Sequence, residues 1–138
     1  MKGQYLTVEY ILFFIIGIVM IISVYFIFSN INKLSERSTL KSQLEAVGEK
    51  IRGTIINILE VSISTESEIK YNLSIPSRLS TCIYTIEVDN DLYLNCTHDV
   101  SIGVTLSLYN LNITTENIIY STRGRVEIDA FYNGVRLK

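Results

Sequence analysis

Two cysteines are the first residues of this 138-residue chain whose spacing suggests chemistry. Cys82 and Cys96 flank the segment IYTIEVDNDLYLN, which has a turn signal, Asp89-Asn90-Asp91, at its middle. They do not form a C-x-x-C motif, and His98, the only histidine, does not complete a zinc-binding pattern. The spacing favours a disulfide across a hairpin, which would place this part of the chain in an oxidising compartment. The alternative is a pair of buried free thiols.

The register of this hairpin decides whether the two sulfurs can meet. A turn centred on Asp89 places residue 82 opposite residue 96. A turn centred on Asn90 makes the pairing diagonal, but both cysteines stay on one face. Closing a loop of this length would stabilise the fold by roughly 3 kcal/mol on a chain-entropy model.

Three asparagines, Asn72, Asn95 and Asn112, stand in N-x-S/T sequons and are candidate N-glycosylation sites. All three fall in the part of the chain with a strand-like pattern. Asn95 should point away from the cysteine face, because neighbouring strand residues point to opposite faces. A used sequon would place this region outside the cell. The alternative is that these are ordinary polar residues of strands and loops.

The sequence contains no recognisable catalytic motif. It has no G-x-S-x-G, no phosphate-binding loop and no clustered carboxylate pair, and its single histidine stands beside Asp99. The sequence therefore predicts no enzyme activity, no catalytic residue, no metal site and no cofactor. A net charge of -2 argues against a nucleic-acid partner, which would need a basic face.

The N-terminal part of the chain predicts a membrane-spanning helix. The segment YILFFIIGIVMIISVYFIFSNIN contains no Asp, Glu, Lys or Arg, and Tyr10 and Tyr25 lie near its ends. About 20 helical residues cross a bilayer core of about 30 Å. A cleaved signal peptide is disfavoured because bulky residues, and no A-x-A-like site, follow the apolar run. A buried core helix is disfavoured because the rest of the chain is too small to wrap it.

The helical pattern continues beyond this segment as an amphipathic stripe. Apolar residues recur at steps of three or four, at Leu40, Leu44, Val47, Ile51, Ile55 and Ile58. We expect one helix from about Leu6 to about Leu59, followed by a polar connector or short strand at VSISTESE.

About six short strands are predicted to follow. They are EIKYNLSIP, TCIYTIEV, LYLNCT, VSIGVTLSL, NIIYS and GRVEIDAFY with VRLK, and Asn133-Gly134 predicts a type I′ hairpin turn. In the first of them Ile69, Tyr71, Leu73 and Ile75 alternate onto one face, and in the fourth Val100, Ile102, Val104, Leu106 and Leu108 do so. The expected fold is α+β: a long N-terminal hydrophobic and then amphipathic helix, packed on a small antiparallel β-sheet or sandwich.

The first residues resemble a known signal. Lys2-Gly3-Gln4, a hydroxyl residue, Glu9 and a long apolar helix resemble the class III signal of archaeal type IV pilin-like proteins. LSIPSRLSTCIYTIEVDNDLYLNC is similar to the proline-ended strand and Tyr-containing hairpin of that family. The resemblance implies a leader at 1–3 cut by a prepilin peptidase between Gly3 and Gln4. It also implies a transmembrane and assembly helix at 4–60 and an extracellular β-domain at 61–138.

This resemblance implies a structural subunit of a surface filament, used for adhesion or attachment. The subunit would be anchored in the membrane before assembly and would then form a homopolymer through its N-terminal helix. The alternative function is a membrane-anchored extracellular binding or accessory module that never polymerises.

Glu9 has two interpretations. A lone carboxylate in hydrocarbon costs several kcal/mol unless it is paired. After a cut before Gln4, the new ammonium of one subunit could pair with Glu9 of its neighbour and fix their register. Alternatively, Glu9 only gains about 0.3–1 kcal/mol from the dipole of the first helical turn.

The basic residues give a conflicting orientation. Lys33, Arg37 and Lys41 follow the apolar run, whereas Lys2 alone precedes it. The positive-inside rule would leave the following domain in the cytoplasm. We give more weight to the cysteines and the sequons, which place it outside.

Overall fold

The computed structural model describes the backbone of residues 2–138 and the side chains of residues 7–138. One helix, α1 (Lys2–Thr65), precedes eight strands and one short 3-10 helix. The chain divides into two compact units, Met1–Arg37 and Ser38–Lys138. The fold is α+β, as the sequence predicts.

The first unit contains the apolar part of α1, and its large hydrophobic side chains are exposed. Phe14, Ile21 and Tyr25 are each about 70% exposed, at 69%, 71% and 71%. Among the described residues, α1 is the one helix that is long and apolar enough to cross a membrane. A helix bonds its own backbone groups internally, so these side chains alone decide which solvent the segment prefers.

In the second unit, α1 supplies one wall of the core. The predicted stripe is buried at Leu40, Leu44, Val47, Ile51 and Ile55, while Ile58 is partly buried against the same core. Gly48 lies in this stripe, where an added Cβ would press on Leu106 and Leu94 of the strands. The stripe therefore sits directly on the sheet, as its spacing predicts.

The helix ends at Thr65, later than the prediction of about Leu59. The segment VSISTESE is not a connector or a strand; its first residues form the last turn of α1. In this last turn Ser64 Oγ and Thr65 Oγ1 both donate to the Val61 carbonyl, so their hydroxyls are satisfied within the helix. The buried Ser62 Oγ donates to Ser67 O at 2.7 Å after Glu66 takes a left-handed φ of 49°. The Ser67 N–H donates to the Ser62 carbonyl at 3.3 Å and so satisfies one of the carbonyls that the helix end leaves free.

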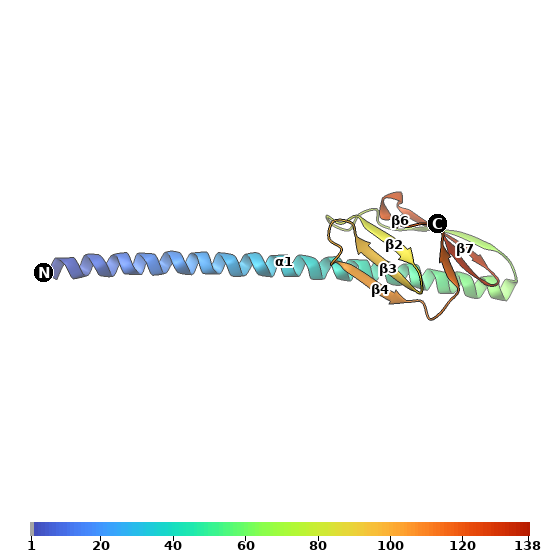
Figure 1. Cartoon of the computed structure of the whole chain (residues 1–138), viewed down its shortest axis with the longest axis horizontal. Helices are drawn as coiled ribbons and strands as arrows, with labels where there is room; N and C mark the ends of the chain where they lie inside the picture. Colours follow the sequence, from blue (N-terminus) through green and yellow to red (C-terminus); the bar gives the residue numbers. More distant parts are fainter. Residues whose placement is uncertain (1) are drawn as a thin grey trace. The chain divides into compact units, whose positions relative to one another are not determined.

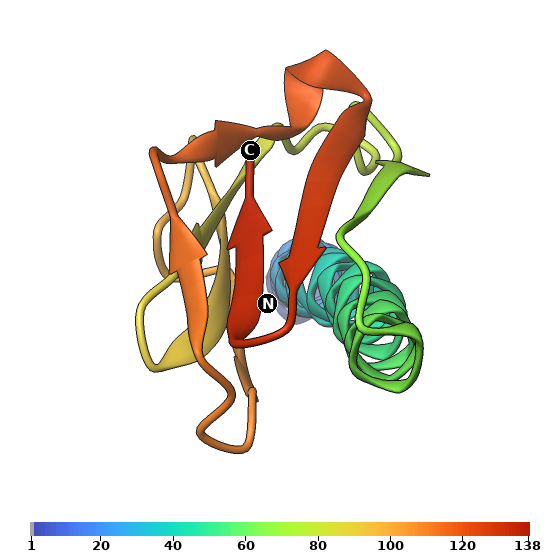
Figure 2. The ribbon, with the colours of Figure 1, turned by 90° about the vertical axis from the view of Figure 1, so that its right-hand side faces the viewer.

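The strands form two four-stranded sheets (Figure 1). The first has the order β1-β7-β8-β5 and the second the order β4-β3-β2-β6. The strands are β1 (Ile69–Ser74), β2 (Tyr84–Val88), β3 (Asp91–Cys96), β4 (Gly103–Ser107), β5 (Ile113–Thr115), β6 (Ile119–Tyr120), β7 (Arg125–Phe131) and β8 (Gly134–Leu137). Figure 2 shows β7 and β8 side by side in red. All pairings are antiparallel except that of β5 with β8, which is parallel.

The two sheets share one apolar core with α1. They meet where β5 ends beside β2, and there Thr115 Oγ1 donates to the Val88 carbonyl at 3.2 Å. The inner faces of both sheets supply buried residues such as Ile86, Leu94 and Ile128. The strand alternation that the sequence shows is thus used to bury one face of each sheet.

Tyr71 lies on the same side of β1 as the buried Leu73, as predicted, but it is 47% exposed because β1 is an edge strand. Two details of the strand prediction were wrong. Val100 is 78% exposed because it falls in a turn before β4. The β7–β8 hairpin exists, but its turn is not type I′. Such a turn needs a positive φ at both central residues, and neither Asn133 nor Gly134 has one. Glycine is needed at position 134 for another reason: the backbone of Asn112 lies so close that a Cβ at this position would overlap Asn112 O.

Candidate functional site

The structure contains the expected disulfide between Cys82 and Cys96. Their Cα atoms are 5.7 Å apart, and both residues are buried. The hairpin pairs Tyr84 with Cys96 and Val88 with Leu92, so its turn is centred on Asn90. Cys82 precedes β2 and forms an isolated bridge with Leu79. The disulfide therefore ties the end of β3 to the loop that leads into β2.

A buried tyrosine holds the same loop from the other side. Tyr84 is fully buried, and its hydroxyl donates to Pro76 O at 2.7 Å. Ser121 Oγ donates to Ser77 O at 2.9 Å and accepts from the Tyr84 N–H at 3.1 Å. Burial raises the pKa of Tyr84 to about 12, because the phenolate would lose its hydration. The loop at 76–83 is thus fixed by the disulfide, by this hydroxyl and by Ser121.

This tyrosine predicts a specific loss of stability in alkali. An unfolded tyrosine ionises near pH 10, whereas folded Tyr84 stays neutral until about pH 12. Stability is therefore intact below pH 10 and falls above it, by about 2–3 kcal/mol at pH 12. Urea unfolding at neutral pH and at about pH 11 should show this fall in the wild type and not in Tyr84→Phe. If the free energy of unfolding fell equally with pH in the wild type and in Tyr84→Phe, burial of Tyr84 would not be the cause of the fall.

The three sequons lie in different environments. Asn72 is exposed on the outer face of the first sheet, opposite Glu127 of β7. Asn112 is exposed, but its Nδ2 donates to Asn133 O at 2.9 Å. Its carbonyl accepts from the Val135 N–H at 2.9 Å. Asn112 thus braces the β7–β8 turn with both its side chain and its backbone.

Asn95 is half-buried on the outer face of β3, away from the cysteine face as the strand alternation predicts. Its cross-strand partner on β4 is Gly103. A Cβ at Gly103 would overlap Asn95 Oδ1, so the asparagine amide lies over the glycine. Only glycine leaves room for this arrangement.

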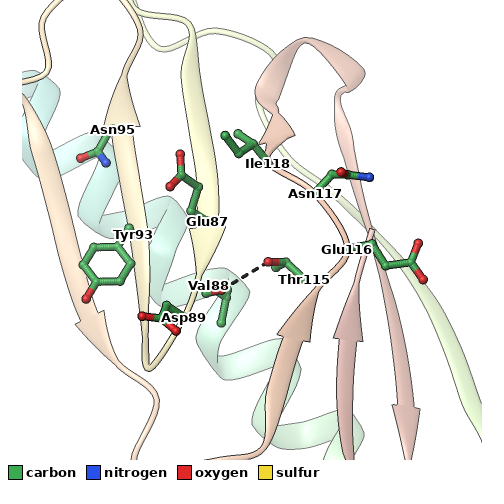
Figure 3. A pocket seen from close by; sticks show the side chains of 9 residues that line it. All are labelled: Glu87, Val88, Asp89, Tyr93, Asn95, Thr115, Glu116, Asn117 and Ile118. Carbon is green, nitrogen blue, oxygen red and sulfur yellow. Dashed lines mark hydrogen bonds between the residues drawn. The ribbon is translucent and has the colours of Figure 1, made fainter.

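Asn95 also lines an open cleft of about 510 Å³ (Figure 3). The outer face of the β2–β3 hairpin forms the floor, with Glu87, Asp89, Tyr93 and Asn95. The β5–β6 connection at 115–118 forms the opposite wall, and the bond from Thr115 Oγ1 to Val88 O holds this wall in place. Strand alternation places Glu87, Tyr93 and Asn95 on one face, but no local pattern predicts the wall at 115–118, so the cleft was not predicted.

Glu9 is helical and exposed in the apolar part of α1. The expected leader junction at Gly3 and Gln4 lies outside the residues whose side chains the structure describes. The basic residues Lys33 and Lys41 are exposed on the same helix. Glu9 is thus surrounded in sequence by apolar side chains that face outward, with Tyr10 and Ile11 next to it.

His98 is exposed, and its neighbour Asp99 accepts hydrogen bonds from the N–H and Oγ of Ser101 in a turn. Within residues 7–138, no group of three His, Cys, Asp or Glu side chains is placed to hold a metal ion. Two surfaces are of interest, the exposed apolar part of α1 and the cleft beside Asn95.

Comparisons with protein-family models, with curated proteins and with solved structures give no match to this chain.

Proposed function

We propose that this protein is a structural subunit of an archaeal type IV pilus-like surface filament, assembled through its N-terminal helix. The observation that carries the proposal is the exposed apolar surface of α1 before residue 38, in a helix whose later residues belong to the core of the β-domain. Losing the apolar segment by cleavage would cut inside a helix. The segment is therefore suited to stay attached to the domain.

Exposed apolar side chains need a non-aqueous neighbour. Before assembly, lipid supplies it, because the segment has the length and composition of a membrane span. In a filament, the helices of sister subunits would take the place of lipid through side-chain packing. A contact between different faces of identical subunits does not close on itself and so propagates as a helical polymer.

The β-domain is suited to the outside of the cell. Its disulfide is typical of oxidising compartments, and its loop at 76–83 depends on that bond. The domain would form the outer wall of the filament, where it serves adhesion or attachment. In this proposal a prepilin peptidase removes residues 1–3, and Gln4 becomes the first residue.

Replacing Glu9 by Gln tests the assembly step. In the filament, Glu9 would pair with the ammonium of a neighbouring Gln4, away from water. Removing one partner of such a pair costs about 3–5 kcal/mol, so we expect surface filaments to fall by roughly tenfold or more. Immunoblots of sheared surface material and of membranes measure the two pools.

Glu36→Gln is the matched control for this variant. Glu36 is an exposed carboxylate on the same helix, beyond the apolar run, and its loss should leave filament yield unchanged. Glu9→Asp keeps the charge and should assemble better than Glu9→Gln. Normal filaments from Glu9→Gln would remove the pairing from the proposal.

A further inference from the structure

We propose that Asn95 carries an N-linked oligosaccharide and that its first sugar sits in the cleft beside it, against Tyr93. This inference rests on the proposed extracellular position of the β-domain. It selects one of three sequons, and it names an occupant for a cleft that has no other role in the fold.

The amide of Asn95 is oriented for this purpose. Its Oδ1 lies over Gly103 of β4, so its Nδ2 is directed to the other side. Figure 3 shows this nitrogen on the side of Glu87, toward the cleft. The atom that would bond the sugar therefore faces the open space, and Gly103 makes the orientation possible.

The side chains that line the cleft are of the kinds that bind a sugar. Tyr93 precedes Asn95 by two residues and lies on the same face of β3. Its half-buried ring offers an apolar surface to the C–H face of a sugar, as aromatic side chains do for other flat ligands. Glu87, which pairs with Tyr93 across the hairpin, offers a hydrogen-bond acceptor to the hydroxyls. The volume of about 510 Å³ is in the range of small-ligand sites.

The transfer itself is a substitution without redox change. The donor is an oligosaccharide linked to a polyprenyl phosphate or pyrophosphate. The bond between Asn95 Nδ2 and the anomeric carbon forms, and the bond from that carbon to the phosphate oxygen breaks. The polyprenyl phosphate or pyrophosphate leaves with the bonding electrons, and the proton lost by the amide passes to water. Thr97, the third residue of the sequon, is exposed, and its hydroxyl donates to Ile83 O at 3.0 Å.

The other two sequons lack this combination. Asn72 stands on the outer face of a sheet and does not line the cleft beside Asn95. Asn112 lines a smaller cleft of about 260 Å³ that contains Phe131, but its Nδ2 donates to Asn133 O and its backbone is packed against Gly134. Asn95 therefore lines the larger of the two clefts, and its nitrogen is directed to the side of Glu87 rather than bonded to a turn of the fold.

Peptide mapping of the full-length protein from its own host tests the attachment. Cleavage before Asp91 and Asp99 isolates Asn95 in the peptide 91–98 and separates it from Asn112. We expect this peptide to carry the mass of an oligosaccharide. Thr97→Ser should keep that mass, and Thr97→Val should abolish it.

A double-mutant cycle tests the contact between the first sugar and Tyr93. Thr97→Val should lower the melting temperature of the wild type. In the Tyr93→Ala background it should lower the melting temperature by roughly half as much, or by less than half, because the sugar then has no ring to contact. The hydrogen bond from Thr97 to Ile83 is lost in both backgrounds and cancels. Ser74→Ala, which removes the Asn72 sequon, is the control, and its effect should not depend on Tyr93.

The outcomes separate this inference from the proposed function. An unmodified peptide 91–98, in a chain that is processed and assembled into filaments, overturns the inference alone. If Asn95 is glycosylated but Thr97→Val lowers the melting temperature equally in the wild type and in the Tyr93→Ala background, the contact between the sugar and Tyr93 is overturned. A chain that retains Met1, stays monomeric and carries no sugar overturns the proposed function together with the inference.

Discussion

Replacing Ile51 by alanine is expected to lower the free energy of unfolding of the β-domain by about 2–5 kcal/mol. Ile51 lies at the middle of the buried stripe of α1 and is fully buried, between Val47 and Ile55 in the same core. Removing its outer carbons leaves a cavity between the helix and the sheets that a close-packed core refills only partly. Urea unfolding of the full chain in detergent, followed by tyrosine fluorescence, measures the change.

Ile63→Ala is the matched control for Ile51→Ala. It is the same substitution on the same helix, but Ile63 is 48% exposed, so we expect a loss of less than about 1 kcal/mol. The helix propensity gained is equal in the two variants. Equal losses at positions 51 and 63 would contradict the claim that the stripe, and not the helix alone, holds the domain together.

Removing the disulfide is the second substitution with a large expected effect. The double variant Cys82→Ser, Cys96→Ser should lose about 2–5 kcal/mol, because the bond restricts the unfolded chain and both sulfurs lie in the apolar core. The loop at 76–83 should be the first part to open. Hydrogen exchange and urea unfolding measure the local and the global loss.

The Tyr84→Phe variant separates the disulfide from the other tie on this loop. It removes the hydroxyl bond to Pro76 O and should cost about 1 kcal/mol, less than loss of the disulfide. A double serine variant that is as stable as the oxidised wild type, in the same buffer, would show that the bond has no structural role.

The sequence could predict the helical part of this fold because its signals are local. Leu44, Ile51 and Ile55 follow the helical period, and each of them is buried. The strand alternation of the β2–β3 hairpin was equally readable, and it placed Cys96 inside and Asn95 outside. The register of that hairpin was left between two centres, and the structure selects Asn90.

Features that depend on distant pairings were not predictable. The end of α1 was misjudged for a local reason: the polar composition of 61–68 suggested a connector, yet the helix continues to Thr65 and ends before the left-handed Glu66. The parallel pairing of β5 with β8 joins segments with no local pattern in common. The wall of the cleft beside Asn95 comes from the β5–β6 connection, which is placed by the pairing of β6 with β2, by the pairing of β5 with β8 and by the bond from Thr115 to Val88 O.

The most direct test of the proposed filament is the mass of the subunit in fibrous material sheared from the cell surface. The proposal predicts a polymer whose subunits begin at Gln4 and keep the apolar helix up to residue 37 and beyond. Subunits that lack this helix, or a protein that remains a monomer in the membrane with Met1 in place, would contradict it.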